Sequence, residues 1–264
     1  MRLGVIFCGY DCAELLGKSL VPWFKAKQKA DIKVVGVHGL FKENRQLGLE
    51  DNDFKTQKEL KTYLNPHGLD SLYLQNDYSM LEDELFETEA QIRHHGFELL
   101  AEFRPDYVTL WDGDEEADES SILKLHSFIQ SEPSVAWFKI HYRNLIFSES
   151  LYSKDFAPPR IFKSQFGAWR LNGCYWDNDF DYFDNYGNRR NYDSFPYGEI
   201  PESVCNPLHW TWLDNERSKK KVNYQMKHFG HCGFKIDDTG HLAFNSDYYK
   251  KIGAKPSKLY LRLV

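Results

Sequence analysis

The pattern of apolar and polar positions at the start of the chain predicts alternating strands and helices. Short apolar runs at Leu3–Cys8 and Ile32–His38 indicate buried strands, and the segment 13–25 between them is a predicted helix. A strand, a helix and a second strand in this order usually form a right-handed parallel unit. The opening is therefore typical of a nucleotide-binding α/β fold.

The same reasoning extends along the rest of the chain. It predicts helices at 55–64, 87–103 and 120–129 and strands at 72–74, 108–111 and 134–142. The segment 169–197 is crowded with aromatic residues among Asn, Asp and Gly, and it is predicted to be a long loop. Residues 230–264 carry no motif, and their last six residues suggest a closing strand or a tail that contacts a partner.

Length and composition bound the class of protein. With 264 residues, of which 42% are hydrophobic and 16% aromatic, the chain can bury the core of one α/β domain. A net charge of −6 with one short basic run, 217–221, makes nucleic-acid duplexes poor candidate partners. The sequence has no stretch of ~18 apolar residues, no signal peptide and no paired zinc spacing among its five cysteines. We expect a cytoplasmic protein without a transmembrane segment.

The most informative chemistry is an acidic turn at the end of a predicted strand. The apolar run 108–111 leads directly into Asp112, Gly113 and Asp114. Ligands bind at the carboxyl ends of strands in open α/β sheets, and two acids around a glycine can converge on a divalent cation. The alternative is an ordinary turn that caps the next helix. The chain has no dinucleotide glycine motif and no phosphate-loop lysine, so a diphosphate held by a metal remains as the nucleotide-binding mode.

Residues 106–115 read Asp-Tyr-Val-Thr-Leu-Trp-Asp-Gly-Asp-Glu, and Arg93 and Gly96 lie in the predicted helix before them. This pattern resembles the DxD region of the GT-A fold glycosyltransferases, in particular the family 2-like enzymes that use nucleotide-diphosphate sugars. Arg160 and its two apolar neighbours resemble a later strand of the same family. The resemblance implies a mostly parallel central sheet flanked by helices, with an aromatic-rich extension on the acceptor side. It also implies one domain, 1–264, divided into a nucleotide-sugar half, 1–116, and an acceptor half, 117–264.

The resemblance also implies a metal site and a donor site. The metal, Mn²⁺ or Mg²⁺, would be bound by Asp112, Asp114 and the late histidine His209, although a histidine among aromatic residues is also often a hydrogen-bonded core residue. The residues implied for substrate binding are Cys8, Gly9, Tyr10, Arg93, Asp112, Gly113, Trp176, Lys220 and Tyr224.

The reaction implied is an inverting transfer of the sugar to a hydroxyl of a glycan or another acceptor. The candidates for the base that deprotonates this hydroxyl are Asp177, Asp179, Glu199 and Glu202. We favour Glu202, which precedes His209 in the run Ile-Pro-Glu-Ser-Val. Aromatic rings such as Trp176 in the segment 169–197 could stack on acceptor sugars or could simply pack on the sheet. No clear Glu-Asp or His-Glu signature of the family is present, so the base and the acceptor class stay open.

Two other classes of protein fit the same residues. A metal-dependent phosphohydrolase or nucleotidyltransferase can also use an acidic pair at a strand end, and it would release phosphate or pyrophosphate instead of a nucleoside diphosphate. A non-catalytic carbohydrate-binding protein would use the aromatic segment, and it would keep its sugar binding after a change at Asp112 or Asp114. The fold alone excludes neither class.

Overall fold

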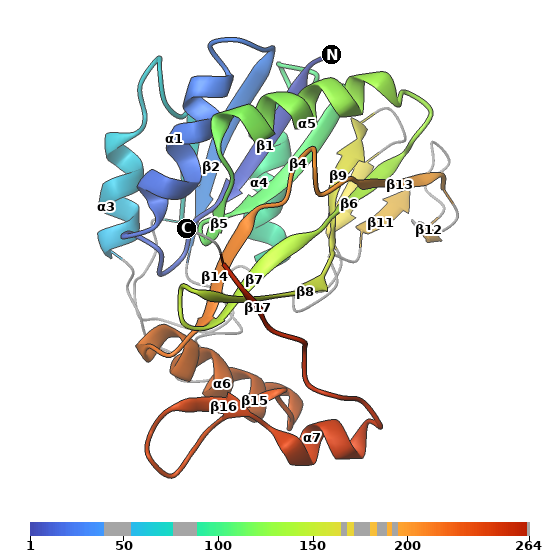
Figure 1. Cartoon of the computed structure of the whole chain (residues 1–264). Helices are drawn as coiled ribbons and strands as arrows, with labels where there is room; N and C mark the ends of the chain where they lie inside the picture. The colour runs from blue at the N-terminus through green and yellow to red at the C-terminus, as the bar shows by residue number, and fades with distance from the viewer. Residues whose placement is uncertain are drawn as a thin grey trace.

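The computed structural model describes residues 1–39, 54–75, 89–164, 168–171, 180–183, 189–191 and 195–262. A seven-stranded sheet lies at the centre of the molecule, with strands in the order β13-β6-β9-β4-β1-β2-β3 (Figure 1). Its strands are β1 (Leu3–Cys8), β2 (Ile32–His38), β3 (Ser71–Leu74), β4 (Tyr107–Asp112), β6 (Trp137–Ile140), β9 (Pro159–Lys163) and β13 (Tyr197–Ile200). Within this sheet, β9 is antiparallel to both of its neighbours and the other pairs are parallel. The expected α/β class with a mostly parallel sheet is confirmed.

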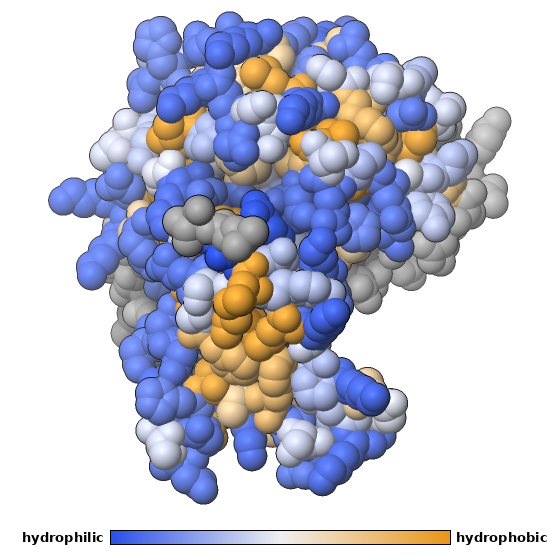
Figure 2. Space-filling view, viewed as in Figure 1, coloured by the Kyte–Doolittle hydropathy of each residue, from blue (hydrophilic) through white to orange (hydrophobic). Residues whose placement is uncertain are grey.

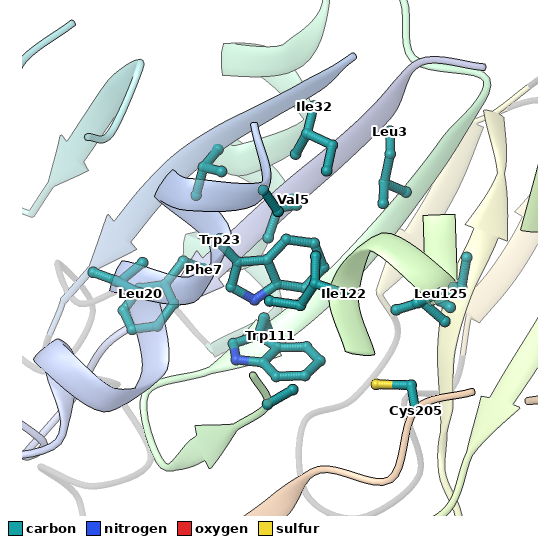
Figure 3. Packing of buried hydrophobic residues seen from close by; sticks show 14 of the residues in the cluster. Leu3, Val5, Phe7, Leu20, Trp23, Ile32, Trp111, Ile122, Leu125 and Cys205 are labelled. Atoms are coloured by element: carbon teal, nitrogen blue, oxygen red, sulfur yellow. The ribbon is translucent and has the colours of Figure 1, made fainter. Parts of the chain in front are cut away.

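Helices cover both faces of this sheet (Figure 1). They are α1 (Leu16–Ala26), α3 (Phe54–Thr62), α4 (Glu89–Leu100) and α5 (Glu119–Ser131). On the α1 and α5 face, the ring of Trp23 meets Trp111 edge to face at 5.1 Å, as Figure 3 shows. On the opposite face, Ile92 of α4 packs in one cluster with Ile6 and Leu110. Successive residues of β1 and β4 alternate between the two clusters, because side chains of a strand point to opposite faces.

A second sheet of five strands brings together segments that are far apart in the sequence. It has the order β17-β8-β7-β14-β5 and consists of β5 (Glu115–Glu116), β7 (Tyr142–Phe147), β8 (Leu151–Phe156), β14 (Leu208–Leu213) and β17 (Tyr260–Leu261). The short β5 follows the acidic turn and pairs antiparallel with β14, so that Glu115 lies opposite His209. This pairing brings the late histidine to the acidic turn although they are far apart in the sequence.

The C-terminal part forms a small module below the second sheet in Figure 1. It contains α6 (Glu216–Phe229), β15 (Phe234–Ile236), β16 (Leu242–Phe244) and α7 (Ser246–Lys251). Helix α6 begins at Asn215, whose side chain accepts a hydrogen bond from the Ser218 amide, and ends at Gly230 in the left-handed conformation. Figure 2 shows apolar residues gathered on this face where β17 and β14 approach the module. No helix in the described part of the chain is both long and apolar enough to cross a membrane.

Two sequence predictions of secondary structure are corrected. The predicted strand 134–142 is divided at His141, because β6 belongs to the central sheet and β7 to the second sheet. The predicted loop 169–197 contains an antiparallel sheet of β10 (Ala168–Leu171), β11 (Phe180–Phe183) and β12 (Arg189–Asn191). The frequent Asn, Asp and Gly residues of this segment favoured a loop, whereas aromatic residues, which favour strands, stand in β10 and β11.

Close packing of α4 on β1 predicts a large effect of one small substitution. A Cβ atom on Gly96 would lie 2.3 Å from Cγ2 of the buried Ile6, whereas a Cβ on Gly17 of α1 meets nothing nearer than 3.7 Å. We expect Gly96→Ala to lower the free energy of unfolding by roughly 1–3 kcal/mol through overpacking. The matched change Gly17→Ala should be neutral or stabilise by up to about 1 kcal/mol. Equal stability of the two variants in urea denaturation would show that α4 does not lie this close to β1.

Candidate functional site

The acidic turn between β4 and β5 is pressed against the loop that follows β1. The Gly113 amide donates a hydrogen bond of 2.9 Å to the Cys8 carbonyl oxygen. A Cβ atom at Gly113 would lie 2.2 Å from Sγ of Cys12. The turn therefore needs glycine at this position for close approach, and the approach fixes the directions of Asp112 and Asp114.

Asp112 lies between two arginines on the α4 face of the sheet. Its Oδ1 accepts a hydrogen bond from Nη2 of Arg93 at 2.8 Å, and its Oδ2 accepts one from Nη2 of Arg160 at 2.8 Å. Burial opposes the ionisation of Asp112, but the two guanidinium groups outweigh it and hold its pKa below the usual value. Both oxygens of Asp112 thus have a charged partner.

Glu115 is a fully buried carboxyl group that shares Arg160 with Asp112. Its Oε1 lies 2.5 Å from Nη2 of Arg160, and its Oε2 accepts a hydrogen bond of 3.1 Å from the Asp112 amide. Burial raises the pKa of Glu115 to about 8, and the charges of Asp112 and Asp114 act in the same direction. One guanidinium cannot keep both buried carboxyl groups ionised when a second arginine favours Asp112. Glu115 therefore keeps its proton for most molecules at neutral pH.

Asp114 contacts residues of both β14 and α6. Its Oδ2 accepts hydrogen bonds from Oγ1 of Thr211 at 2.9 Å and from Nη2 of Arg217 at 3.2 Å, and Nε2 of His209 lies 3.5 Å away. Burial opposes its ionisation, but His209, Arg217 and Lys221 outweigh burial and hold the pKa of Asp114 well below its usual value. Lys221 follows Arg217 by four residues, so both lie on the same side of α6.

His209 makes contacts through both of its ring nitrogens. Its Nδ1 lies 2.8 Å from Oδ1 of Asn144. Its Nε2 lies 2.6 Å from Oγ1 of Thr211 and 3.5 Å from Oδ2 of Asp114. Burial lowers the pKa of His209 to about 4, which leaves a neutral imidazole at pH 7. A neutral ring with one nitrogen fixed by a second hydrogen bond is the form that binds metals.

These residues decide how well a divalent metal fits. No group of three or more His, Cys, Asp or Glu in the described ranges is placed to hold a metal ion. Asp114 and His209 nevertheless offer one carboxylate and one imidazole within 3.5 Å of each other. Mg²⁺ and similar ions are commonly bound by one or two protein ligands together with phosphate oxygens of a substrate. The pair fits such a shared site, whereas Asp112 has both oxygens on arginines.

The other residues predicted for the donor lie around the ends of β1 and α6. Cys8 is buried at the end of β1 and pairs in register with Asp112, and the Gly9 amide bonds to the Val37 carbonyl oxygen. Tyr10 is half-buried, with its ring 6.5 Å from that of His38. On α6, Lys220 is exposed and Tyr224 is half-buried.

Two of the four predicted base candidates, Glu199 and Glu202, lie within the described residues. Glu199 on β13 contacts His141 at 3.2 Å, and Glu202 just beyond β13 contacts Nζ of Lys154 at 2.6 Å. Both glutamates are exposed side chains near the carboxyl end of β13. Asp177, Asp179 and the predicted sugar-stacking Trp176 lie outside the described residues.

Several site residues were not identified from the sequence as such. Thr211 could have been found, because it lies two residues after His209 and so shares its face of a strand. Arg217 and Lys221 carried a weaker signal as part of a basic run on a helix. The contact of Asn144 with His209 depends on the parallel register of β7 and β14, and that of Arg160 depends on the position of β9 next to β4. Neither register can be read from local sequence.

The buried neutral state of His209 predicts a specific pH dependence of stability. Its folded pKa of about 4 lies below the unfolded value of about 6.5, so the unfolded chain binds more protons between these two pH values. The stabilisation from neutral His209 is complete above pH 6.5 and is lost as the pH falls towards 4. We expect the native protein to lose about 3 kcal/mol more stability than His209→Gln between pH 7 and 4. If the free energy of unfolding, measured in denaturant, changes equally with pH in the two proteins, the buried neutral imidazole is disproved.

The similarity of this chain to known proteins is confined to solved structures of low sequence identity. No protein-family model matches the sequence, and a search of curated proteins finds no similar one. A crystal structure of S. aureus TarS 1–349 in complex with UDP-GlcNAc is 16% identical with a TM-score of 0.40, over 63% of this chain and 46% of that chain. A second structure of TarS 1–349 gives 17% identity, a TM-score of 0.39 and coverages of 63% and 48%. A structure of S. aureus TarS is 15% identical with a TM-score of 0.37, over 63% of this chain and 29% of that chain. This chain spans less than half the length of each of them.

Proposed function

We propose that this protein is a metal-dependent glycosyltransferase that moves a sugar from a nucleotide-diphosphate sugar to a hydroxyl of a glycan or another acceptor. The observation that carries this proposal is the convergence of His209 and Arg217 on Asp114 at the carboxyl end of β4. This edge of an open α/β sheet is the usual position of a nucleotide ligand. The resemblance of the acidic turn to the GT-A enzymes supports the same reading.

The site offers cationic groups to a diphosphate. Arg93 and Arg160 contact Asp112, and Arg217 contacts Asp114 with Lys221 nearby. Asp11 and Glu14 also act on Arg217. Nη1 of Arg217 is also a buried donor without a hydrogen-bond partner among the described residues. A buried unpaired donor is costly, and a phosphate oxygen would satisfy it.

Each residue then has a role in the transfer. Asp114 and His209 would hold Mn²⁺ or Mg²⁺ together with the donor diphosphate. The bound metal would stabilise negative charge on the departing nucleoside diphosphate. Arg217 and Lys221 would stabilise the same charge directly. Asp112, fixed by its two arginines, would accept a hydroxyl hydrogen bond from the donor.

The acceptor would approach from the side of β13. Strands β4 and β13 are separated by β9 and β6, so about 14 Å lies between them at a spacing of about 4.8 Å per strand. This distance leaves room for the transferred sugar between the diphosphate and a base. We propose Glu202 as the base for an inverting reaction, with Glu199 as the alternative within the described residues. A loss of kcat in Glu202→Gln, with kcat retained in Glu199→Gln even where KM for the acceptor rises, would support this choice.

The test is an analysis of products from UDP-, GDP- and dTDP-sugars with Mn²⁺. We expect release of the nucleoside diphosphate from one donor class, slowly by hydrolysis and faster when a suitable acceptor is present. Release of inorganic phosphate or pyrophosphate instead would contradict the proposal and favour a phosphohydrolase or nucleotidyltransferase. Separation of the nucleotide products by anion-exchange chromatography distinguishes these outcomes.

A further inference from the structure

An exposed aromatic residue lies on β13, an edge strand of the central sheet in the described part of the chain. Tyr197 on β13 is 55% exposed, although most large hydrophobic side chains of the sheet are buried. Its ring stacks on that of Trp137 with centroids 4.8 Å apart and an interplanar angle of 17°. Trp137 is itself 1% exposed and belongs to the core, so it fixes the orientation of the tyrosine ring. The result is a rigid aromatic platform that remains open to solvent.

Polar side chains lie around this platform. Glu199 follows Tyr197 by two residues and therefore lies on the same face of β13. It is paired in register with Lys139 of β6, whose Nζ lies 5.3 Å from the centroid of the Tyr197 ring. Nε2 of His141 lies 3.2 Å from Oε2 of Glu199, and both side chains are accessible. An aromatic face is thus bordered by a carboxylate, an imidazole and an ammonium group.

This combination matches the chemistry of a saccharide. The C–H face of a sugar ring is apolar and packs on an aromatic ring, while its hydroxyls need both acceptors and donors around the edge. Glu199 supplies the acceptors, and Lys139 and His141 supply donors. Pairing of β13 with a strand of another molecule is the competing explanation for an exposed sheet edge. A four-residue edge strand that carries a glutamate is poorly suited to such pairing.

The platform lies on the same face of the sheet as Asp112 of the proposed donor site. Trp137 packs in one cluster with Leu110, so the side chain two residues after Leu110, that of Asp112, is on that face as well. Strands β4, β6 and β13 are parallel to one another in direction, and Asp112, His141 and Glu199 all lie near their carboxyl ends. The platform is three strands from Asp112 along this edge (Figure 1).

We propose that Tyr197, Lys139, Glu199 and His141 form a binding site for a saccharide acceptor, with one sugar ring stacked on Tyr197. This inference rests on the proposed transferase function, because it gives that function an acceptor of carbohydrate class and a place for it. It does not require donor or metal to be bound.

The test is saturation-transfer NMR with five tetrasaccharides, without nucleotide or metal. The probes are cellotetraose, chitotetraose, maltotetraose, mannotetraose and a hyaluronan tetrasaccharide. We expect at least one to bind, with affinity reduced roughly tenfold in Tyr197→Ala, in line with the loss of an aromatic stacking contact. Tyr197→Trp should retain binding. Tyr260→Ala is the matched control, because Tyr260 is likewise stacked on a second aromatic ring, that of Tyr152, with centroids 5.6 Å apart, and it should leave binding unchanged.

Other outcomes would overturn this site. If no tetrasaccharide binds, or if Tyr197→Ala binds as well as the native protein, Tyr197 is not an acceptor platform. If the native chain is a dimer in analytical ultracentrifugation and Tyr197→Ala is a monomer, the edge is a contact between copies of the chain. Saccharide binding should persist in Asp114→Ala, and donor binding should persist in Tyr197→Ala. A failure of this site is therefore separable from a failure of the proposed function.

Discussion

Replacing Asp114 by alanine is expected to reduce sugar transfer by about 1000-fold or more. Asp114 is both a proposed metal ligand and the buried anion that positions Arg217 and Thr211. Metal stabilisation of a leaving group supplies several kcal/mol, and each 1.36 kcal/mol corresponds to a factor of ten in rate. Initial rates of nucleoside diphosphate release at saturating donor would measure this loss.

Asp118→Ala is the matched control for Asp114→Ala. Asp118 lies four residues later in the same acidic stretch, but its side chain caps α5 by accepting from the Ser121 amide at 2.8 Å. Its loss should cost about 1 kcal/mol of stability and leave the rate of transfer unchanged. Transfer that survives in Asp114→Ala, or falls equally in both variants, would contradict the assigned role of Asp114.

The second large effect is expected for stability rather than for activity. Arg160 is 3% exposed, and it contacts both Asp112 and Glu115. Arg160→Met would leave the buried Asp112 carboxylate with the charge of Arg93 alone, and breaking a buried ion pair typically costs about 3–5 kcal/mol. We therefore expect Arg160→Met to lower the free energy of unfolding by this amount, as measured in urea at pH 7.

Two further variants separate charge from packing at Arg160. Glu115→Gln should lower the free energy of unfolding by about 1–3 kcal/mol, less than Arg160→Met, because the side chain stays neutral but its NH2 group must face the Asp112 amide or Arg160, both of which are donors. The double variant Arg160→Met with Asp112→Asn should recover part of the loss, because the buried anion is then removed. A small effect of Arg160→Met, or no recovery in the double variant, would show that the arginine does not balance Asp112.

Local patterns were sufficient for the elements that begin the fold. Strands β1, β2 and β4 are buried on both faces and read as continuous apolar runs, so their positions follow from the sequence. The position of Asp112 and Asp114 at the end of β4 followed for the same reason. Arg93 lies in α4, the helix that precedes β4, and it contacts Asp112 at the end of that strand.

The rest of the site depends on contacts between distant segments. Arg160 reaches Asp112 because β9 inserts antiparallel next to β4, and His209 reaches Asp114 because β14 pairs with β5. The apolar run 134–142 gave no sign of its division between two sheets at His141. Such strand orders are set by the packing of the whole core, and a single sequence without that packing does not specify them.

The most direct test of the central claim is a thermal-shift screen of UDP-, GDP-, dTDP- and CMP-sugars with and without Mn²⁺. A ligand that binds the folded state raises apparent stability by mass action. We predict a shift for one class of diphosphate donor that requires Mn²⁺, is absent with the monophosphate CMP-sugar, and is lost in Asp114→Ala. No shift with any donor, or a shift that Asp114→Ala retains, would contradict a metal-held diphosphate at Asp114 and His209.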